Sequence, residues 1–194
     1  MTQSNVESNK TYVIAEAGSN FNSDISIAKK MIKVAADCGA DAVKFQLFKA
    51  SVLYPDKLNP AYEIVKKCEL PRNWLTDLFD FAQQHNIDFI ASPFDQEAVE
   101  LLSKMDVVAI KVGSSEVTNL QLLRKIGETG IPVILSTGMC TLGELADAVE
   151  ILENSLCNDI TLLHCVSVYP CPIEDVNLRT MSLLANTFKK KIGY

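Results

Sequence analysis

Histidine and paired cysteines are scarce in this chain of 194 residues, which limits the metal sites it can build. Only His85 and His164 occur, and none of the six cysteines belongs to a C-x-x-C pair. A zinc cluster is therefore poorly supported, because such clusters need four closely spaced cysteine or histidine ligands. We expect the cysteines to be reduced thiols.

Positive charge is also in short supply, with 18 Lys and Arg against 24 Asp and Glu and a formal net charge of −6. A general field for nucleic acid or an anionic membrane is not expected, so any bound anion must be caught by a few placed cations and backbone N–H groups. No apolar stretch approaches the ~20 residues of a membrane span. The polar start of the chain, residues 1–10, does not resemble a signal peptide. We expect a cytoplasmic protein without nucleic-acid or membrane partners.

Short apolar runs alternate with helix-period segments along the whole chain. The runs are almost continuously apolar, which is typical of parallel strands covered on both faces. A possible seventh run starts at residue 191. The predicted strands are Tyr12–Ala15, Ala42–Gln46, Phe89–Ser92, Val107–Lys111, Val133–Ser136 and Ile160–His164. Apolar residues at helical spacing separate them, and Thr141 with Glu144 predicts a capping box.

Repeated β-α units indicate a parallel sheet, either doubly wound or closed as a TIM-type (β/α)8 barrel. The first run lacks the G-x-G-x-x-G of a dinucleotide fold, since Glu16 to Asn20 reads EAGSN. Polar residues follow nearly every run, as in barrel enzymes. We therefore expect residues 1–194 to form a partial barrel domain of about six and a half units. The long segment 49–70, with a short helix near Ala61–Lys67, is a candidate substrate lid.

Lys44 and Lys111 are the most informative of these polar residues, because each is a lone cation inside an apolar run. An unpaired buried ammonium is costly, and a bound phosphate or carboxylate would offset that cost. Alternatively, each lysine points outward or pairs with Glu16 or Glu116. The loops Gly113–Ser115 and Ser136–Gly138 can present further donors to an anion. His164 is either catalytic or bonded to a neighbouring strand end.

Six motifs, taken together, resemble the N-acetylneuraminate (sialic acid) synthase family from Tyr12 to the last residue. They are IAEAGSN, DAVKFQ, ASPFD, IKVGSSE, ILSTGM and LLHCVSVYPCP, in the family's order and approximate spacing. The resemblance implies a transferase of carbohydrate (nonulosonic acid, polysaccharide) biosynthesis. Such an enzyme condenses phosphoenolpyruvate with N-acetylmannosamine or a related acylated sugar and releases phosphate. It also implies a divalent metal, Mn²⁺ or Mg²⁺, that polarises the sugar aldehyde.

The resemblance also implies roles for individual residues. Glu16, Lys44 and Glu116 are expected to be catalytic. The phosphoenolpyruvate contacts are expected to be Lys44, Ser92, Lys111, Ser114, Ser136 and Ser167. The residues that bind the sugar are expected to be Gln46, Phe94, Glu116 and Tyr169. No metal ligand is expected in this chain: the family's metal histidines, the last barrel units and a C-terminal antifreeze-like domain are expected beyond Tyr194.

Two rival hypotheses remain open at this point. The chain could be a truncated or degenerate ligand-binding fragment without activity of its own, since the expected metal histidines are missing. It could also be another phosphoenolpyruvate-condensing barrel, although no extra basic cluster offers a second phosphate site. In either case, an incomplete barrel exposes strand edges, so we expect a homodimer or other self-association.

Overall fold

The fold is one parallel sheet with helices packed along its outside, as the computed structural model of residues 10–194 describes it. Seven strands follow one another in the order β1 to β7, and every neighbouring pair is parallel. A doubly wound sheet would reverse its strand order at a switch point, so this sequential order confirms the partial barrel. The strands are β1 (Ile14–Gly18), β2 (Ala42–Leu47), β3 (Asp88–Pro93), β4 (Ile110–Val112), β5 (Val133–Ser136), β6 (Ile160–Leu163) and β7 (Lys191–Gly193).

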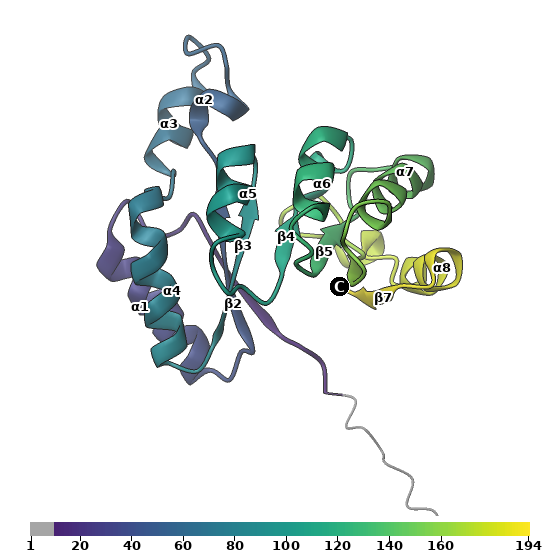
Figure 1. The fold of residues 1–194 in the computed structure, drawn as a ribbon, viewed down its shortest axis with the longest axis horizontal. Coiled ribbons are helices and arrows are strands. Elements are labelled where there is room, and N and C mark those ends of the chain that lie inside the picture. Colours follow the sequence, from purple (N-terminus) through teal and green to yellow (C-terminus); the bar gives the residue numbers. More distant parts are fainter. Residues whose placement is uncertain (1–9) are drawn as a thin grey trace, which may run out of the picture.

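The helices alternate with the strands, and Figure 1 shows the curled sheet with α1 and α4 at one side and α6 to α8 at the other. No helix among residues 10–194 is long and apolar enough to cross a membrane. The α-helices are α1 (Ile25–Asp37), α2 (Ala50–Leu53), α3 (Ala61–Lys67), α4 (Leu75–Gln84), α5 (Gln96–Leu102), α6 (Leu120–Gly127), α7 (Leu142–Glu153) and α8 (Arg179–Phe188). The short 3-10 turns are η1 (Arg72–Trp74), η2 (Ser114–Glu116) and η3 (Ile173–Asp175).

Local sequence signals account for several of these boundaries. The expected capping box is present at α7, where the Thr141 hydroxyl and the Glu144 carboxylate satisfy each other's backbone N–H groups. The expected short helix near Ala61–Lys67 is α3, with the predicted bounds. Asp24 caps α1 by accepting a hydrogen bond from Ser26 N at 2.7 Å.

Two predicted strand starts are wrong by two or three residues, and a third, that of β3, by one. The first strand begins at Ile14 rather than at Tyr12, because Val13 N donates to the Asp41 side chain at 2.8 Å instead of to a strand carbonyl. The fourth strand begins at Ile110, three residues later than expected, where Ile110 N donates to Pro132 O at 2.8 Å. Apolar character alone does not reveal where strand pairing starts.

The sheet has two faces of different character, and their alternation decides which side chains reach the interior. The outer face belongs to the main core, where Phe45 stacks on Phe89 with ring centroids 5.7 Å apart. The inner face carries a separate small cluster of Ala42, Ile90 and Ala109. Because successive strand residues point to opposite faces, residues two positions beyond these also face inward.

Within residues 10–194, β1 and β7 each pair with a strand on one side only. A hollow at the amino-terminal ends of the strands is lined by Ile90, Ala109 and Ile134 together with polar residues of neighbouring strands. The barrel wall is therefore open between β1 and β7 in the described part of the chain.

Candidate functional site at the carboxyl ends of the strands

The inward-facing positions at the carboxyl ends of five neighbouring strands are polar. By the alternation of each strand, Glu16 shares its face with Ile14, and Lys44 shares its face with Ala42. The same alternation places one polar residue on each of the next three strands. These are Ser92 on β3, Lys111 on β4 and Ser136 on β5, and all three are buried. The structure therefore brings five sequence-predicted site residues to one face.

Lys44 pairs with Glu16, which is its direct neighbour in the register of β1 and β2. Only 9% of the Lys44 side chain is exposed, whereas 53% of the Glu16 side chain is exposed. The ammonium thus sits inside the sheet while its carboxylate partner reaches solvent. The alternative that Lys44 is paired with Glu16 is the one the structure bears out.

Lys111 has a different environment, because its hydrogen-bond acceptors are neutral. Its ammonium donates to Ser136 Oγ at 2.5 Å and to the Val112 carbonyl at 3.1 Å. None of the ion pairs among residues 10–194 includes it. Burial and, as a smaller effect, the positive charge of Lys44 together lower the pKa of Lys111 to about 8. The arrangement leaves a buried cation without a carboxylate partner, which suits an incoming anion.

Ser136 also accepts a hydrogen bond from the Cys165 thiol, with a sulfur-to-oxygen distance of 3.3 Å. The loops after β5 and β6 lie close together here: a Cβ on Gly138 would lie 2.7 Å from Ser167 Oγ and 2.9 Å from the Cys165 carbonyl oxygen. Sequence reasoning overlooked Cys165. Strand alternation past Leu163 would have found it, since that alternation puts Cys165 inward and His164 outward.

The predicted sugar-side residues are placed around this cluster in different ways. Gln46 accepts a hydrogen bond from the Ser19 hydroxyl at 3.0 Å. Glu116, on η2 with the half-buried Ser114, accepts from Asn119 Nδ2 at 2.9 Å. Tyr169 is 92% exposed, so the structure does not bring it into the cluster. Ser167, predicted to contact phosphoenolpyruvate, is also exposed, although it lies against Gly138.

Phe94 lies at the border of the cluster, directly after β3. Its ring packs edge-on against Phe48, with centroids 6.0 Å apart. The tip of the ring is 4.0 Å from where a Cβ on Gly113 would stand, between β4 and η2. Phe94 therefore connects the loops that follow β2, β3 and β4.

The described residues do not form a metal-binding group: residues 10–194 contain no cluster of three or more His, Cys, Asp or Glu side chains. His164 Nε2 is bonded to the Val176 carbonyl at 2.7 Å, and its ring lies beside Tyr194. His85 Nδ1 is bonded to the Phe81 carbonyl at 2.8 Å. Both histidines thus have structural partners within the fold.

The sequential parallel sheet, with polar residues on its inner face at the strand ends, defines a β/α-barrel protein with its candidate site at the expected end of the barrel. The NeuB family model matches residues 31–194, and the chain belongs to that family. This confirms the resemblance to the sialic acid synthases that the six motifs indicated.

Individual relatives agree with this assignment. N,N'-diacetyllegionaminic acid synthase of Campylobacter jejuni is 42% identical over 200 residues, which cover 95% of this chain and 60% of the relative. Pseudaminic acid synthase of Helicobacter pylori is 35% identical over 195 residues, which cover 93% and 57%. The crystal structure of N-acetylneuraminic acid (sialic acid) synthetase from Leptospira borgpetersenii superposes with a TM-score of 0.90 at 34% identity, covering all of this chain and 68% of that one. The chain spans somewhat more than half the length of the two curated relatives.

Proposed function

We propose that this chain carries the phosphoenolpyruvate-binding part of a nonulosonic acid synthase. The relatives are synthases of legionaminic and pseudaminic acid, and a solved relative is a sialic acid synthetase. The reaction is the condensation of phosphoenolpyruvate with N-acetylmannosamine or a related acylated amino sugar. It belongs to carbohydrate biosynthesis in the cytoplasm.

The main support for this proposal is that two lysines are buried on one face and only one of them has a carboxylate partner. Lys111 has only neutral acceptors, so a phosphate or carboxylate would complete its hydrogen bonding and supply the missing negative charge. Lys44 adds a second positive charge close enough to influence the pKa of Lys111. Phosphoenolpyruvate carries both a phosphate and a carboxylate, which matches two cations on neighbouring parts of one face.

The remaining predicted residues complete the proposed site. Ser92 and Ser136 are buried on the same inner face as the lysines and offer hydroxyl donors, and Ser114 and Ser167 lie in the loops after β4 and β6. Glu16 is held by Lys44 with its carboxylate partly in solvent, where it can face the sugar. Glu116, Gln46, Phe94 and Tyr169 are assigned to the sugar side.

The chemistry is a carbon–carbon bond formation that ends in phosphate release. C3 of phosphoenolpyruvate attacks the open-chain sugar aldehyde, whose oxygen takes up a proton. Water adds at C2, and phosphate leaves with cleavage of its C–O bond. In this scheme Lys44 and Lys111 bind and orient the two anionic groups, and the burial of Lys111 strengthens its interaction with them. A Mn²⁺ or Mg²⁺ ion remains part of the proposal, with ligands that the described residues do not supply.

A second candidate function is ligand binding without turnover, since the polar cluster by itself accounts only for the binding of an anion. Two measurements on the same protein distinguish the two functions. Phosphoenolpyruvate binding is followed by calorimetry, and phosphate release is followed with N-acetylmannosamine or a diacetamido sugar and Mn²⁺. Binding with phosphate release supports the synthase, and binding without release with any acylated hexosamine supports the binding protein. Absence of phosphoenolpyruvate binding would refute both.

A further inference from the structure

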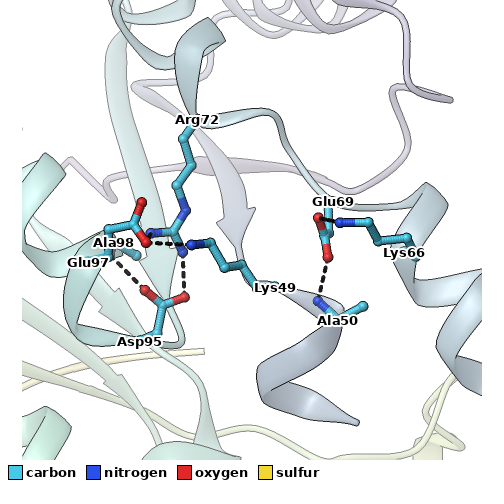
Figure 2. A network of polar contacts seen from close by, with 8 residues as sticks. All are labelled: Lys49, Ala50, Lys66, Glu69, Arg72, Asp95, Glu97 and Ala98. Atoms are coloured by element: carbon cyan, nitrogen blue, oxygen red, sulfur yellow. Dashed lines mark hydrogen bonds and ion pairs between the residues drawn. The ribbon is translucent and has the colours of Figure 1, made fainter. Parts of the chain in front are cut away.

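The segment between β2 and α4 is held at both of its ends by one pair of carboxylates. We call residues 49–72 the arm. Lys49, at the start of the arm, pairs with Glu97 in the first turn of α5. Arg72, at the end of the arm, pairs with Asp95 through Nη2, while its Nη1 lies 3.1 Å from Glu97 Oε2 (Figure 2). Two chain positions 23 residues apart thus meet at the start of one helix.

The pair of Arg72 and Asp95 is the more buried part of this network, with 14% of each side chain exposed. Arg72 Nη1 is fully buried, and no hydrogen bond of good geometry reaches it. Asp95 also caps α5, because its Oδ1 accepts from Ala98 N at 2.9 Å. Glu97 is more exposed, and its hydrogen bond with Lys49 lowers its pKa, so it is ionised at neutral pH.

Beyond its base, the arm has little apolar packing of its own. Helix α3 has no buried residue, and Leu58 and Ile64 are 90% and 68% exposed. A third polar contact lies at the base, where Glu69 accepts from Ala50 N at 2.6 Å and pairs with Lys66. Apart from the buried Ala50 and Leu70 near its ends, the arm is therefore held by polar contacts, and Figure 1 shows α2 and α3 standing apart at the top of the view.

The network is joined directly to the candidate site through the chain. Asp95 follows Phe94, and Lys49 follows Phe48, so the two charged residues flank the edge-on ring pair. Phe94 N also donates to Leu47 O at 3.2 Å. Any displacement of Asp95 would therefore move the ring that borders Gly113 and the end of β4.

We propose that Arg72 is a positioning residue: its pairing with Asp95 holds the arm to α5 and holds Phe94 where the acylated sugar binds. Arg72 itself does not touch the substrate. The holding of the arm rests on the observed contacts alone, whereas the effect on the sugar rests on the proposed function. Loss of the pair of Arg72 and Asp95 should loosen the arm and weaken sugar binding. The binding of phosphoenolpyruvate by Lys44 and Lys111 should not change.

Limited trypsin digestion of the native protein tests the first part. Lys57, Lys66 and Lys67 lie in the arm and report on its opening. R72Q and D95N should each speed cleavage there by about tenfold, the size expected for one charge-assisted hydrogen bond. D95N is informative because asparagine still caps a helix and only the charge is lost. K190Q, which removes the remote pair of Lys190 and Glu153, is the control. Equal cleavage rates in R72Q, K190Q and wild type would overturn the proposal.

Steady-state kinetics of the active synthase test the second part. In R72Q, we expect KM for the sugar to rise about tenfold while KM for phosphoenolpyruvate changes less than about twofold, with partial recovery in R72K. A loosened arm with unchanged sugar KM, or an equal rise in both KM values, would show that Arg72 is merely structural. If wild type neither binds phosphoenolpyruvate nor turns over, the proposed function fails, and the digestion still decides whether Arg72 holds the arm.

Discussion

Lys111 donates a 2.5 Å hydrogen bond to Ser136 Oγ across the neighbouring strands β4 and β5, and this neutral hydroxyl stands where a carboxylate would be expected beside a buried lysine. Lys44, two strands away, has such a carboxylate in Glu16. Lys44 therefore has a negatively charged partner and Lys111 does not. The positive charge of Lys111 remains available to bind an anion.

Replacing Lys111 by methionine should separate binding from stability. K111M keeps the length of the side chain and removes a buried charge, so we expect unfolding to be unaffected or slightly harder. Affinity for phosphoenolpyruvate should fall by about tenfold or more, because one charge-assisted hydrogen bond is lost. Calorimetry and thermal melting check both, with K190M, in the remote pair with Glu153, as the control. A lower melting temperature with unchanged affinity would contradict the assignment.

Binding and stability should respond to pH in opposite directions. The pKa of Lys111 is lowered to about 8 from an unfolded value of 10.5, chiefly by burial. Between these values the unfolded chain binds more protons, so stability rises with pH, by on the order of 2 kcal/mol from pH 7.5 to 9.5. Anion affinity needs the protonated lysine and should fall as pH rises through about 8. Urea unfolding and calorimetry at both pH values, with K111M as reference, measure the effect of this residue alone. Curves of wild type and K111M that run parallel with pH would refute the assignment.

Gly138 should not tolerate a side chain. In G138A the new Cβ would lie within 3 Å of Ser167 Oγ and of the Cys165 carbonyl, so the loops after β5 and β6 must separate. We expect a loss of about 1–3 kcal/mol of stability, as for overpacking, together with weaker phosphoenolpyruvate binding. Gly143, on α7, has nothing closer than 3.9 Å, and G143A should be neutral or stabilising. Equal urea midpoints for G138A and G143A would show that the loops after β5 and β6 can separate without a loss of stability.

The chain of residues 1–194 should self-associate when purified. The described strands β1 and β7 each have a free edge, and the inner residues Ile90, Ala109 and Ile134 line an open hollow. Unpaired strand edges promote strand addition between molecules. Sedimentation velocity over a concentration series checks this, and we expect dimers or larger species. A concentration-independent monomer that melts cooperatively would contradict the expectation.

Much of the fold could be predicted because it depends on patterns among residues that are close in sequence. Apolar runs of strand length, separated by helix-period segments, are a local property, and so is the capping box of Thr141 and Glu144. The starts of β1 and β4 were misplaced because pairing partners distant in sequence decide them. The Asp41 side chain accepts the hydrogen bond of Val13 N, and no local pattern encodes that contact.

The shared face of the candidate residues was predictable, whereas the choice between the alternative partners of each lysine was not. Strand-end position and family motifs led to Lys44, Lys111, Ser92 and Ser136, and the structure places all four on one inner face. Tyr169 shares the motif evidence but not the location, since its side chain is exposed. Its role in sugar binding stays a prediction.

The sequence by itself determined the β-α order, the family and the two lysines embedded in apolar strands, since these depend on residue type and spacing. Only the tertiary structure decided that Glu16 neutralises Lys44 whereas Ser136 faces Lys111, because strand register selects each neighbour. The contact of Arg72 with Asp95 was equally invisible in the sequence. It joins residues 23 positions apart through the path of the arm, and chain folding rather than local propensity sets that path.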